Sequence, residues 1–196
     1  MKKLFACIFT CSLFYGHSQD LYKDSLNNYL STYVQKHEVV TGDDKQFFSF
    51  FPVNEKYKVT ALFEETNNSK WFSMETSGTI KKTFRVYGVL HFAINDTPVT
   101  LNLYQSQNLM NIAEYKNHLF LPFTDITSGE ETYAAGRYID LHISDIKNNK
   151  VVIDFNKAYN PYCAYVSGKY NCPIPPKENQ LAVAILAGEK TFTKTH

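Results

Sequence analysis

The 196-residue sequence lacks the short motifs that identify many enzymes and cofactor-binding proteins. It has no glycine-rich GxGxxG loop, no GxSxG nucleophile elbow, and no HxH or HExxH histidine pair. Four of the six histidines, His37, His91, His118 and His142, are scattered along the chain with no such spacing. The sequence therefore assigns no metal site and no cofactor. A calcium site built from Asp125, Glu131 and backbone carbonyls is the alternative that the residue types leave open.

Positive charge is too sparse to indicate a nucleic acid partner. The formal net charge is only +1, and the 20 basic residues include just two arginines, Arg85 and Arg137. No basic tract is available to follow a phosphate backbone, so we do not expect nucleic acid binding. A chain that uses lysine for routine surface charge is expected to keep arginine where a planar, bidentate donor is needed. The alternative is that codon bias favours lysine over arginine throughout the chain and that these two arginines remain by chance.

Long hydrophobic runs are also missing. A membrane-spanning helix needs about 20 apolar residues, and no segment reaches that length, so we expect no transmembrane anchor. The most apolar stretch, residues 4–15, follows Lys2 and Lys3 and precedes a small-residue cleavage site ending at Ser18, as in a secretory signal peptide. We therefore expect residues 1–18 to be removed and the mature protein to be extracytoplasmic, either periplasmic or secreted. The alternative is an N-terminal helix or strand buried in the fold.

Cysteine is scarce, and two of the four cysteines lie in the predicted signal peptide. The remaining pair, Cys163 and Cys172, are nine positions apart. In an exported protein such a pair is a disulfide candidate, which would stabilise a short loop by roughly 2–3 kcal/mol. Two reduced structural thiols, or half of a metal site, are the alternatives. The spacing is not CxxC, and no nearby histidine completes a zinc set.

Aromatic residues, by contrast, are abundant at 15% of the chain and recur in short runs with β-branched residues. An amphipathic helix is predicted over residues 20–37, and four of the seven prolines predict a long ordered loop over 157–180. The predicted strands span 46–51, 57–65, 70–76, 83–94, 99–105, 119–123, 138–146, 151–156 and 181–186. Short strands without alternating helices favour a mainly β, single domain over residues 19–196. We expect an antiparallel β-barrel or β-sandwich with an N-terminal amphipathic helix.

The two strands on either side of Asn148 and Asn149 are predicted to pair as a hairpin. Each alternates apolar and polar residues, and a two-residue turn would set Ile143 opposite Asp154 and mix the faces. An odd loop length restores agreement, and a three-residue loop places His142 opposite Asp154 and Asp140 opposite Asn156. The polar face of this hairpin is then expected to line a cavity or to face solvent.

The C-terminal region from 119 to 189 interleaves acids, Asn and Tyr with Gly and Pro. Buried polar groups are costly unless they satisfy one another, so this density predicts a polar network that marks a site. The blocks PFTDITSGEETYAAGRYIDL, DFNKAYNPYCAY, CPIPPKEN and AGE closely resemble the DUF1684 family of bacterial and archaeal proteins of unknown function. Looser upstream matches extend the resemblance over most of residues 37–189. The resemblance implies no established activity, ligand or cofactor.

These blocks supply the candidate site residues. The carboxylates that are candidates for acid–base catalysis, as in glycoside hydrolysis, are Asp125, Glu131, Asp154 and Glu178. The alternative is that they cap turns and form ion pairs. The candidates for ligand binding are Arg137, Tyr133, Tyr138, Asp140, Asn156, Asn160, Tyr165 and Asn179.

Arg137 is the central candidate, because a guanidinium grips a carboxylate or phosphate bidentately. Its alternative role is a buried structural ion pair with Asp140, Asp154 or Glu178. The leading hypothesis is an exported protein that binds a small polar ligand in a pocket lined by these motifs. The alternatives are a hydrolase that uses two of the carboxylates and a non-catalytic structural or interaction module.

Overall fold

The structure, a computed structural model, describes residues 11–194, with side chains from residue 20 onward. The predicted signal peptide thus lies mostly outside the described residues. The helix α1 spans Cys11–Lys36. The strands are β1 Lys58–Glu65, β2 Phe72–Met74, β3 Lys82–Ile94, β4 Thr97–Ser106, β5 His118–Phe123, β6 Arg137–His142 and β7 Lys150–Asp154. Short 3-10 helices span Gly42–Phe47, Glu55–Tyr57, Leu109–Asn111, Ile143–Asp145, Phe155–Lys157, Tyr162–Ala164 and Lys177–Asn179.

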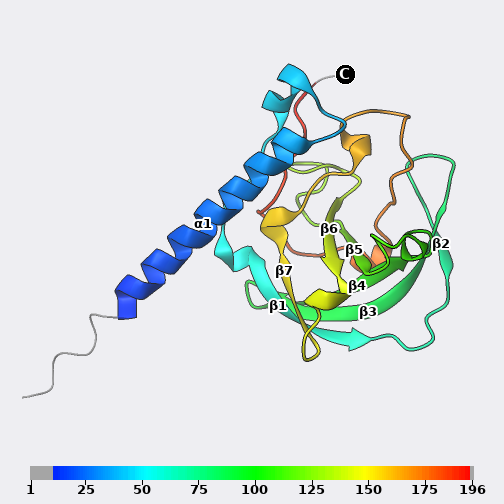
Figure 1. The fold of residues 1–196 in the computed structure, drawn as a ribbon, viewed down its shortest axis with the longest axis horizontal. Coiled ribbons are helices and arrows are strands. Elements are labelled where there is room, and N and C mark those ends of the chain that lie inside the picture. The colour runs from blue at the N-terminus through cyan, green and yellow to red at the C-terminus, as the bar shows by residue number, and fades with distance from the viewer. Residues whose placement is uncertain (1–10, 195–196) are drawn as a thin grey trace, which may run out of the picture.

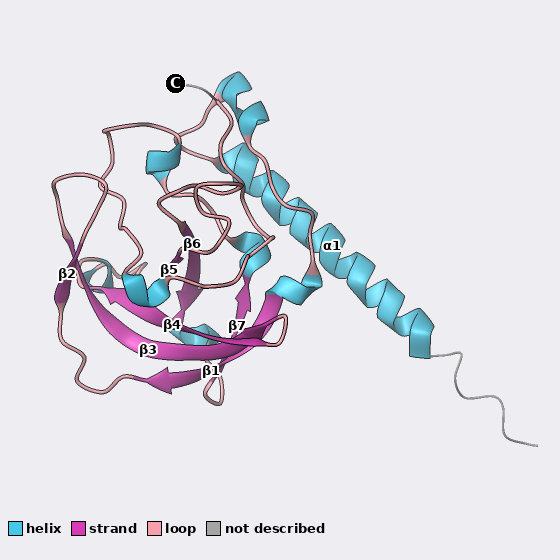
Figure 2. Ribbon diagram, turned by 180° about the vertical axis from the view of Figure 1, so that it is seen from behind, coloured by secondary structure: helices cyan, strands magenta, loops and turns pink. Residues whose placement is uncertain are grey.

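The strands form one curled antiparallel sheet in the order β6-β5-β4-β3-β1-β7, and β2 pairs with the first part of β3 (Figures 1 and 2). The long β3 has a bulge between Val86 and Gly88, and bulges increase the local twist and bend of a strand. A Cβ at Gly88 would lie 2.2 Å from a ring atom of Phe63, so only glycine fits there. The prediction of a mainly β antiparallel domain with an N-terminal helix is confirmed. Its sheet is an open half-barrel, with β6 and β7 as the two edges.

The alternation of residues along the strands divides the sheet into two buried faces. On β5 and β6, Leu119, Leu121, Ile139 and Leu141 belong to the main hydrophobic core. The residues between them point the opposite way, because successive side chains of a strand alternate. That opposite face carries a second, aromatic cluster of Met74, Phe84, Tyr104, Phe120 and Tyr138.

The predicted odd-length hairpin is wrong. Asn148 and Asn149 form a two-residue turn between Lys147 and Lys150, and both asparagines have positive φ, at 53° and 56°. This is the backbone of a type I′ turn, which asparagine tolerates well. The conflict between faces disappears because the 3-10 helix Ile143–Asp145 ends β6 before the turn begins.

The strand partners differ from the prediction for the same reason. β6 pairs with β5, so His142 lies opposite His118. β7 pairs with β1 at the other edge of the sheet, so Asp154 lies opposite Lys58. The predicted strand 181–186 is instead an irregular segment that passes through the main core.

α1 lies along one side of the domain (Figure 1), and a stripe of its side chains fastens it there. Tyr22, Leu26, Tyr29 and Tyr33 follow one another at spacings of four, three and four residues, which places them on one helical face. Leu26 is buried, and the Tyr22 hydroxyl lies 3.0 Å from both carboxylate oxygens of Asp154. The helix is therefore held by tyrosine hydroxyls as well as by apolar contact.

Candidate functional site

A cavity of about 830 Å³ lies between α1, the aromatic face of the sheet and the loop that follows β7. Its size falls within the usual range of small-molecule sites. Seven of the chain's fourteen tyrosines line it. The lining residues are Tyr29, Thr32, Tyr33, Lys36, His37, Glu38, Lys82, Phe84, Ser106, Asn108, Leu109, Tyr115, His118, Phe120, Tyr138, Asp140, Tyr159, Pro161, Tyr162, Tyr170, Asn171, Cys172 and Pro173.

The sheet wall of this cavity is set by strand register. Phe84 of β3 pairs with Ser106 of β4, and Phe120 of β5 pairs with Asp140 of β6. Directly paired residues of an antiparallel sheet present their side chains on the same face. Tyr138, two residues before Asp140, lies on that face as well. Four adjacent strands thus combine to build one aromatic wall with a single carboxylate at its edge.

The helix wall follows from helical spacing. Tyr29, Thr32, Tyr33 and Lys36 occupy positions i, i+3, i+4 and i+7 of α1, and all four line the cavity. Residues at this spacing share one side of a helix. The same docking that buries Leu26 therefore brings a tyrosine-rich face over the sheet.

The third wall is the proline-rich loop, and a disulfide holds it. Cys163 and Cys172 are bonded, with Cα atoms 6.2 Å apart. The sequence leaves open a disulfide, two reduced thiols or half of a metal site for these cysteines, and in the structure they form the disulfide. At the start of the loop, Tyr159 exchanges two backbone hydrogen bonds with Tyr138, of 2.9 and 3.0 Å. These bonds cover the exposed edge of β6.

One hydrogen-bonded polar group stands out in the cavity. Asp140 lies with Oδ1 2.9 Å from Nε2 of His118 and accepts a 2.8 Å hydrogen bond at Oδ2 from the hydroxyl of Tyr159. Burial and the neighbouring Asp140 charge raise the pKa of Tyr159 well above its ordinary value, so it stays a neutral donor. Nδ1 of His118 has no hydrogen-bond partner. The Asp140 side chain is still 42% exposed, so a ligand can reach its oxygens.

Tyr138 and Asp140 are the predicted ligand-binding residues that line this cavity. Arg137, the central candidate, does not: it is 0% exposed and lies on the opposite face of β6. Its Nη2 donates to Asp125 at 2.9 Å, and its two terminal nitrogens also reach the carbonyl oxygens of Ile185, Ala187 and Glu189. No ligand can touch it. Its partner is Asp125, whereas the sequence suggested Asp140, Asp154 or Glu178.

The remaining ligand-binding candidates have other surroundings. The Asn179 side chain bonds both the N–H and the carbonyl of Asn102. Asn156 bonds Asn54, and the Asn160 Nδ2 donates to a backbone carbonyl. Tyr165 is buried against Glu189, and half-buried Tyr133 lines none of the described cavities. The buried asparagines and Tyr165 hold the C-terminal segments in place and leave little polar surface for a ligand.

The four catalytic candidates lie apart from the cavity. Asp125 is buried beside Arg137, and Asp154 accepts hydrogen bonds from Tyr22 and from Asn156. Glu178 and Glu131 are exposed. The positions of Asp125, Asp154 and Glu131 agree with the alternative that such acids cap turns and form ion pairs.

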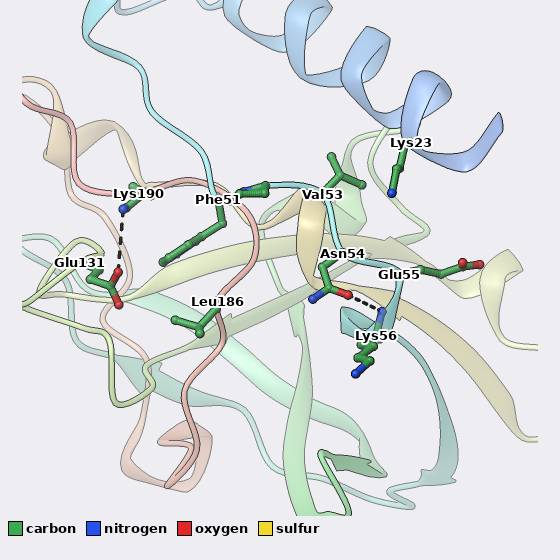
Figure 3. Close-up of a pocket in the computed structure, with 10 residues that line it drawn as sticks. Lys23, Phe51, Val53, Asn54, Glu55, Lys56, Glu131, Leu186 and Lys190 are labelled. Atoms are coloured by element: carbon green, nitrogen blue, oxygen red, sulfur yellow. Dashed lines mark hydrogen bonds and ion pairs between the residues drawn. The ribbon is translucent and has the colours of Figure 1, made fainter. Parts of the chain in front are cut away.

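Glu131 borders a separate surface groove of about 620 Å³ (Figure 3). Its carboxylate lies 3.8 Å from the ammonium of Lys190, and Lys23 extends from α1 toward Val53. The charged groups of this groove are solvated lysines and glutamates. Exposed pairs of this kind contribute little energy, so we assign the groove no ligand.

Glu189 is a buried acid that our sequence reasoning did not select. Its carboxylate accepts hydrogen bonds from the hydroxyls of Tyr165 (2.8 and 2.9 Å) and Tyr33 (3.1 Å) and from the Asn160 N–H (3.0 Å). Burial without a paired cation raises the pKa of Glu189 to about 7. The signal in the sequence that could have identified Glu189 is the AGE block, which ends at this residue. His118 and Phe120 were also missed, although the alternation of apolar and other residues along β5 would have put them on one face.

In the described part of the chain, no group of three or more His, Cys, Asp or Glu side chains is placed to hold a metal ion. None of the helices there combines the length and apolar character needed to span a membrane.

The chain matches one protein family and is similar to a solved structure. The family described as "Protein of unknown function (DUF1684)" matches residues 46–190. A solution NMR structure of an uncharacterized protein from Haloarcula marismortui is similar, with 26% sequence identity and a TM-score of 0.67. The match covers 92% of this chain and 99% of that one. No curated protein matches the sequence significantly.

Proposed function

Because the chain belongs to the DUF1684 family, whose function is unknown, its role has to be inferred from its own site, and we propose that the protein binds a small molecule in the cavity under α1. The ligand has a ring or other flat apolar surface and at least one hydrogen-bonding group. The ring lies among the tyrosines and phenylalanines of the walls, and the polar group meets Asp140 at the rim.

The observation that supports this proposal is the convergence of three distant segments on one cavity. An aromatic sheet face, a helix face and a disulfide-held loop surround about 830 Å³ and leave the Asp140 carboxylate partly exposed. Ligand sites are typically concave and mostly apolar, with a few placed polar groups. Aromatic walls of this kind favour ring-shaped ligands, because stacking adds to the apolar area that is buried.

The test is a thermal-shift screen with a defined panel of ring compounds, followed by calorimetric titration. The panel contains tryptamine, tryptophol, indole-3-acetate, adenosine and 4-nitrophenyl β-glucoside. A compound present at 100 times its dissociation constant should stabilise the fold by about 2.7 kcal/mol. Release of nitrophenolate from the last compound would instead support the hydrolase alternative.

A matched pair of variants locates the site. Thr32→Trp fills the cavity from an exposed helix position and should weaken binding at least about tenfold, or 1.4 kcal/mol. Asn28→Trp adds the same side chain one turn earlier on α1, at an exposed position that lines no described cavity, and should leave affinity unchanged. Failure of the whole panel to bind, or equal losses in both variants, would overturn the proposal.

We also propose that the protein acts outside the cytoplasm. The support is the signal-peptide pattern ending at Ser18 and the Cys163–Cys172 disulfide, a bond that persists in oxidising compartments. Removal of residues 1–18 leaves the docking residues Tyr22 to Tyr33 of α1 in the mature chain. N-terminal sequencing of the protein from the extracytoplasmic fraction should begin at Gln19. Retention of Met1 there would contradict this proposal.

A further inference from the structure

Asp140 is the acidic group that faces the cavity from a fixed position. Its two oxygens are oriented by His118 and by Tyr159, at 2.9 and 2.8 Å. A carboxylate has about four acceptor sites, so each oxygen keeps capacity for a further donor. Among the residues that the structure describes, no lysine or arginine nitrogen lies within ion-pair distance of it, and His118 is its only basic neighbour at that range. The short side chain and its two partners hold this negative charge in place.

Tyrosine rings surround that carboxylate. After burial, which is the largest cause, the Asp140 charge contributes to raising the pKa values of Tyr29 and Tyr159, so its field reaches rings on both α1 and the loop. The pKa of Tyr162 is raised by burial, then by the neighbouring Glu38, and least by Asp140. The Tyr159 ring lies 5.8 Å from that of Tyr138. Because their pKa values are raised, these phenols stay neutral at physiological pH. Neutral aromatic faces beside an anion make an environment that favours a cation.

The cavity also contains cationic side chains, and how freely they can move determines whether they offset the negative charge of Asp140. Lys36 and Lys82 both line it, as does a second acid, Glu38, and partial burial of the Lys82 ammonium lowers its pKa. All three residues are exposed overall, and a lysine stem can swing its ammonium into water at little cost. Asp140 is short and held by two hydrogen bonds, so it cannot move away from a ligand in the same way. The fixed charge of the site is therefore negative.

We propose that the ligand is an organic amine that carries a positive charge, with its ammonium on Asp140 and its apolar body among the surrounding tyrosines. This inference rests on the proposed function and names the chemical class of its ligand. The ammonium donates to the free acceptor sites of the carboxylate, and charge-assisted hydrogen bonds of this kind are about twice as strong as neutral ones. Contact of the cation with the tyrosine faces adds to its affinity.

The experiment compares three indole compounds of similar size that differ in charge, titrated calorimetrically into the intact protein. Tryptamine is a cation, tryptophol is neutral and indole-3-acetate is an anion. Tryptamine should bind at least about tenfold more tightly than tryptophol, and indole-3-acetate should bind most weakly. Asp140→Asn keeps the shape of the side chain and should remove this preference, while the affinity for tryptophol changes less than about threefold.

Asp145→Asn is the matched control. Asp145 is also exposed, at 46%, and also lies near a histidine, but it lines none of the described cavities. It should leave all three affinities unchanged. Equal binding of tryptamine and tryptophol that Thr32→Trp still weakens would overturn the amine inference and leave the proposed function standing. Tightest binding of indole-3-acetate would also overturn the inference and would point to the lysines, whereas no binding by any panel compound removes both proposals.

Discussion

Replacing Arg137 by Met should destabilise the fold severely without acting through the cavity. The substitution keeps an unbranched apolar side chain in the core and removes the guanidinium that bonds Asp125 and three backbone carbonyls. The carboxylate of Asp125 stays buried and keeps hydrogen bonds from Thr127 and from the Ile185 N–H, so part of its charge remains compensated.

The expected magnitude follows from these contacts. Breaking a fully buried ion pair by removing one partner costs about 3–5 kcal/mol. The three carbonyls that lose a donor favour the upper part of that range, since each buried acceptor left unsatisfied carries its own penalty. The free energy of unfolding of ordinary domains is about 5–15 kcal/mol, so the Arg137→Met protein should be only marginally stable.

The assay is urea unfolding followed by far-ultraviolet circular dichroism, with the disulfide intact. The double variant Arg137→Met, Asp125→Asn should recover part of the loss, because the remaining buried group is then neutral. The coupling free energy of the cycle should exceed about 1 kcal/mol. A cost of Arg137→Met below about 1 kcal/mol, or a coupling near zero, would refute the structural role. A selective loss of ligand affinity in a stable variant would instead indicate that Arg137 belongs to the binding site.

Three smaller predictions concern the other buried polar groups and one turn. Because the pKa of Glu189 is about 7 in the fold and about 4.5 in the unfolded chain, the folded state binds this proton more tightly. Between pH 4.5 and 7, the free energy of unfolding of the wild type should therefore fall by up to about 3 kcal/mol relative to that of Glu189→Gln. Urea midpoints of the two proteins that change in parallel across this range would contradict this prediction. Tyr22→Phe should cost about 1 kcal/mol by removing a donor to Asp154, and an unchanged melting temperature would contradict this. At Gly136, where φ is 91° and a Cβ would lie 2.5 Å from a backbone oxygen, alanine should destabilise by more than about 1 kcal/mol. Gly168→Ala, with positive φ but open space, is the control and should cost clearly less.

The local chemistry of the sequence determined the elements and their faces. Runs of aromatic and β-branched residues predicted strands close to the observed β1, β3, β4, β5 and β7, and the N-terminal helix ends within a residue of its predicted end. Alternation along β6 separated Tyr138 and Asp140 from Ile139 and Leu141, and the structure keeps these pairs on opposite faces. These features depend on neighbours only a few residues apart, so a single sequence contains them.

Which faces meet was decided only by the tertiary structure. The sequence paired β6 with β7 because they are consecutive, yet the sheet places them at opposite edges, since the 3-10 helix at Ile143–Asp145 redirects the chain. Arg137 found its partner in Asp125 because the irregular C-terminal segment runs through the core beside it. The cavity joins α1, four strands and the disulfide loop, which are far apart in the chain. Many pairings satisfy the same apolar pattern, and the packing of the whole chain selects one of them, so the wall around Asp140 exists only in three dimensions.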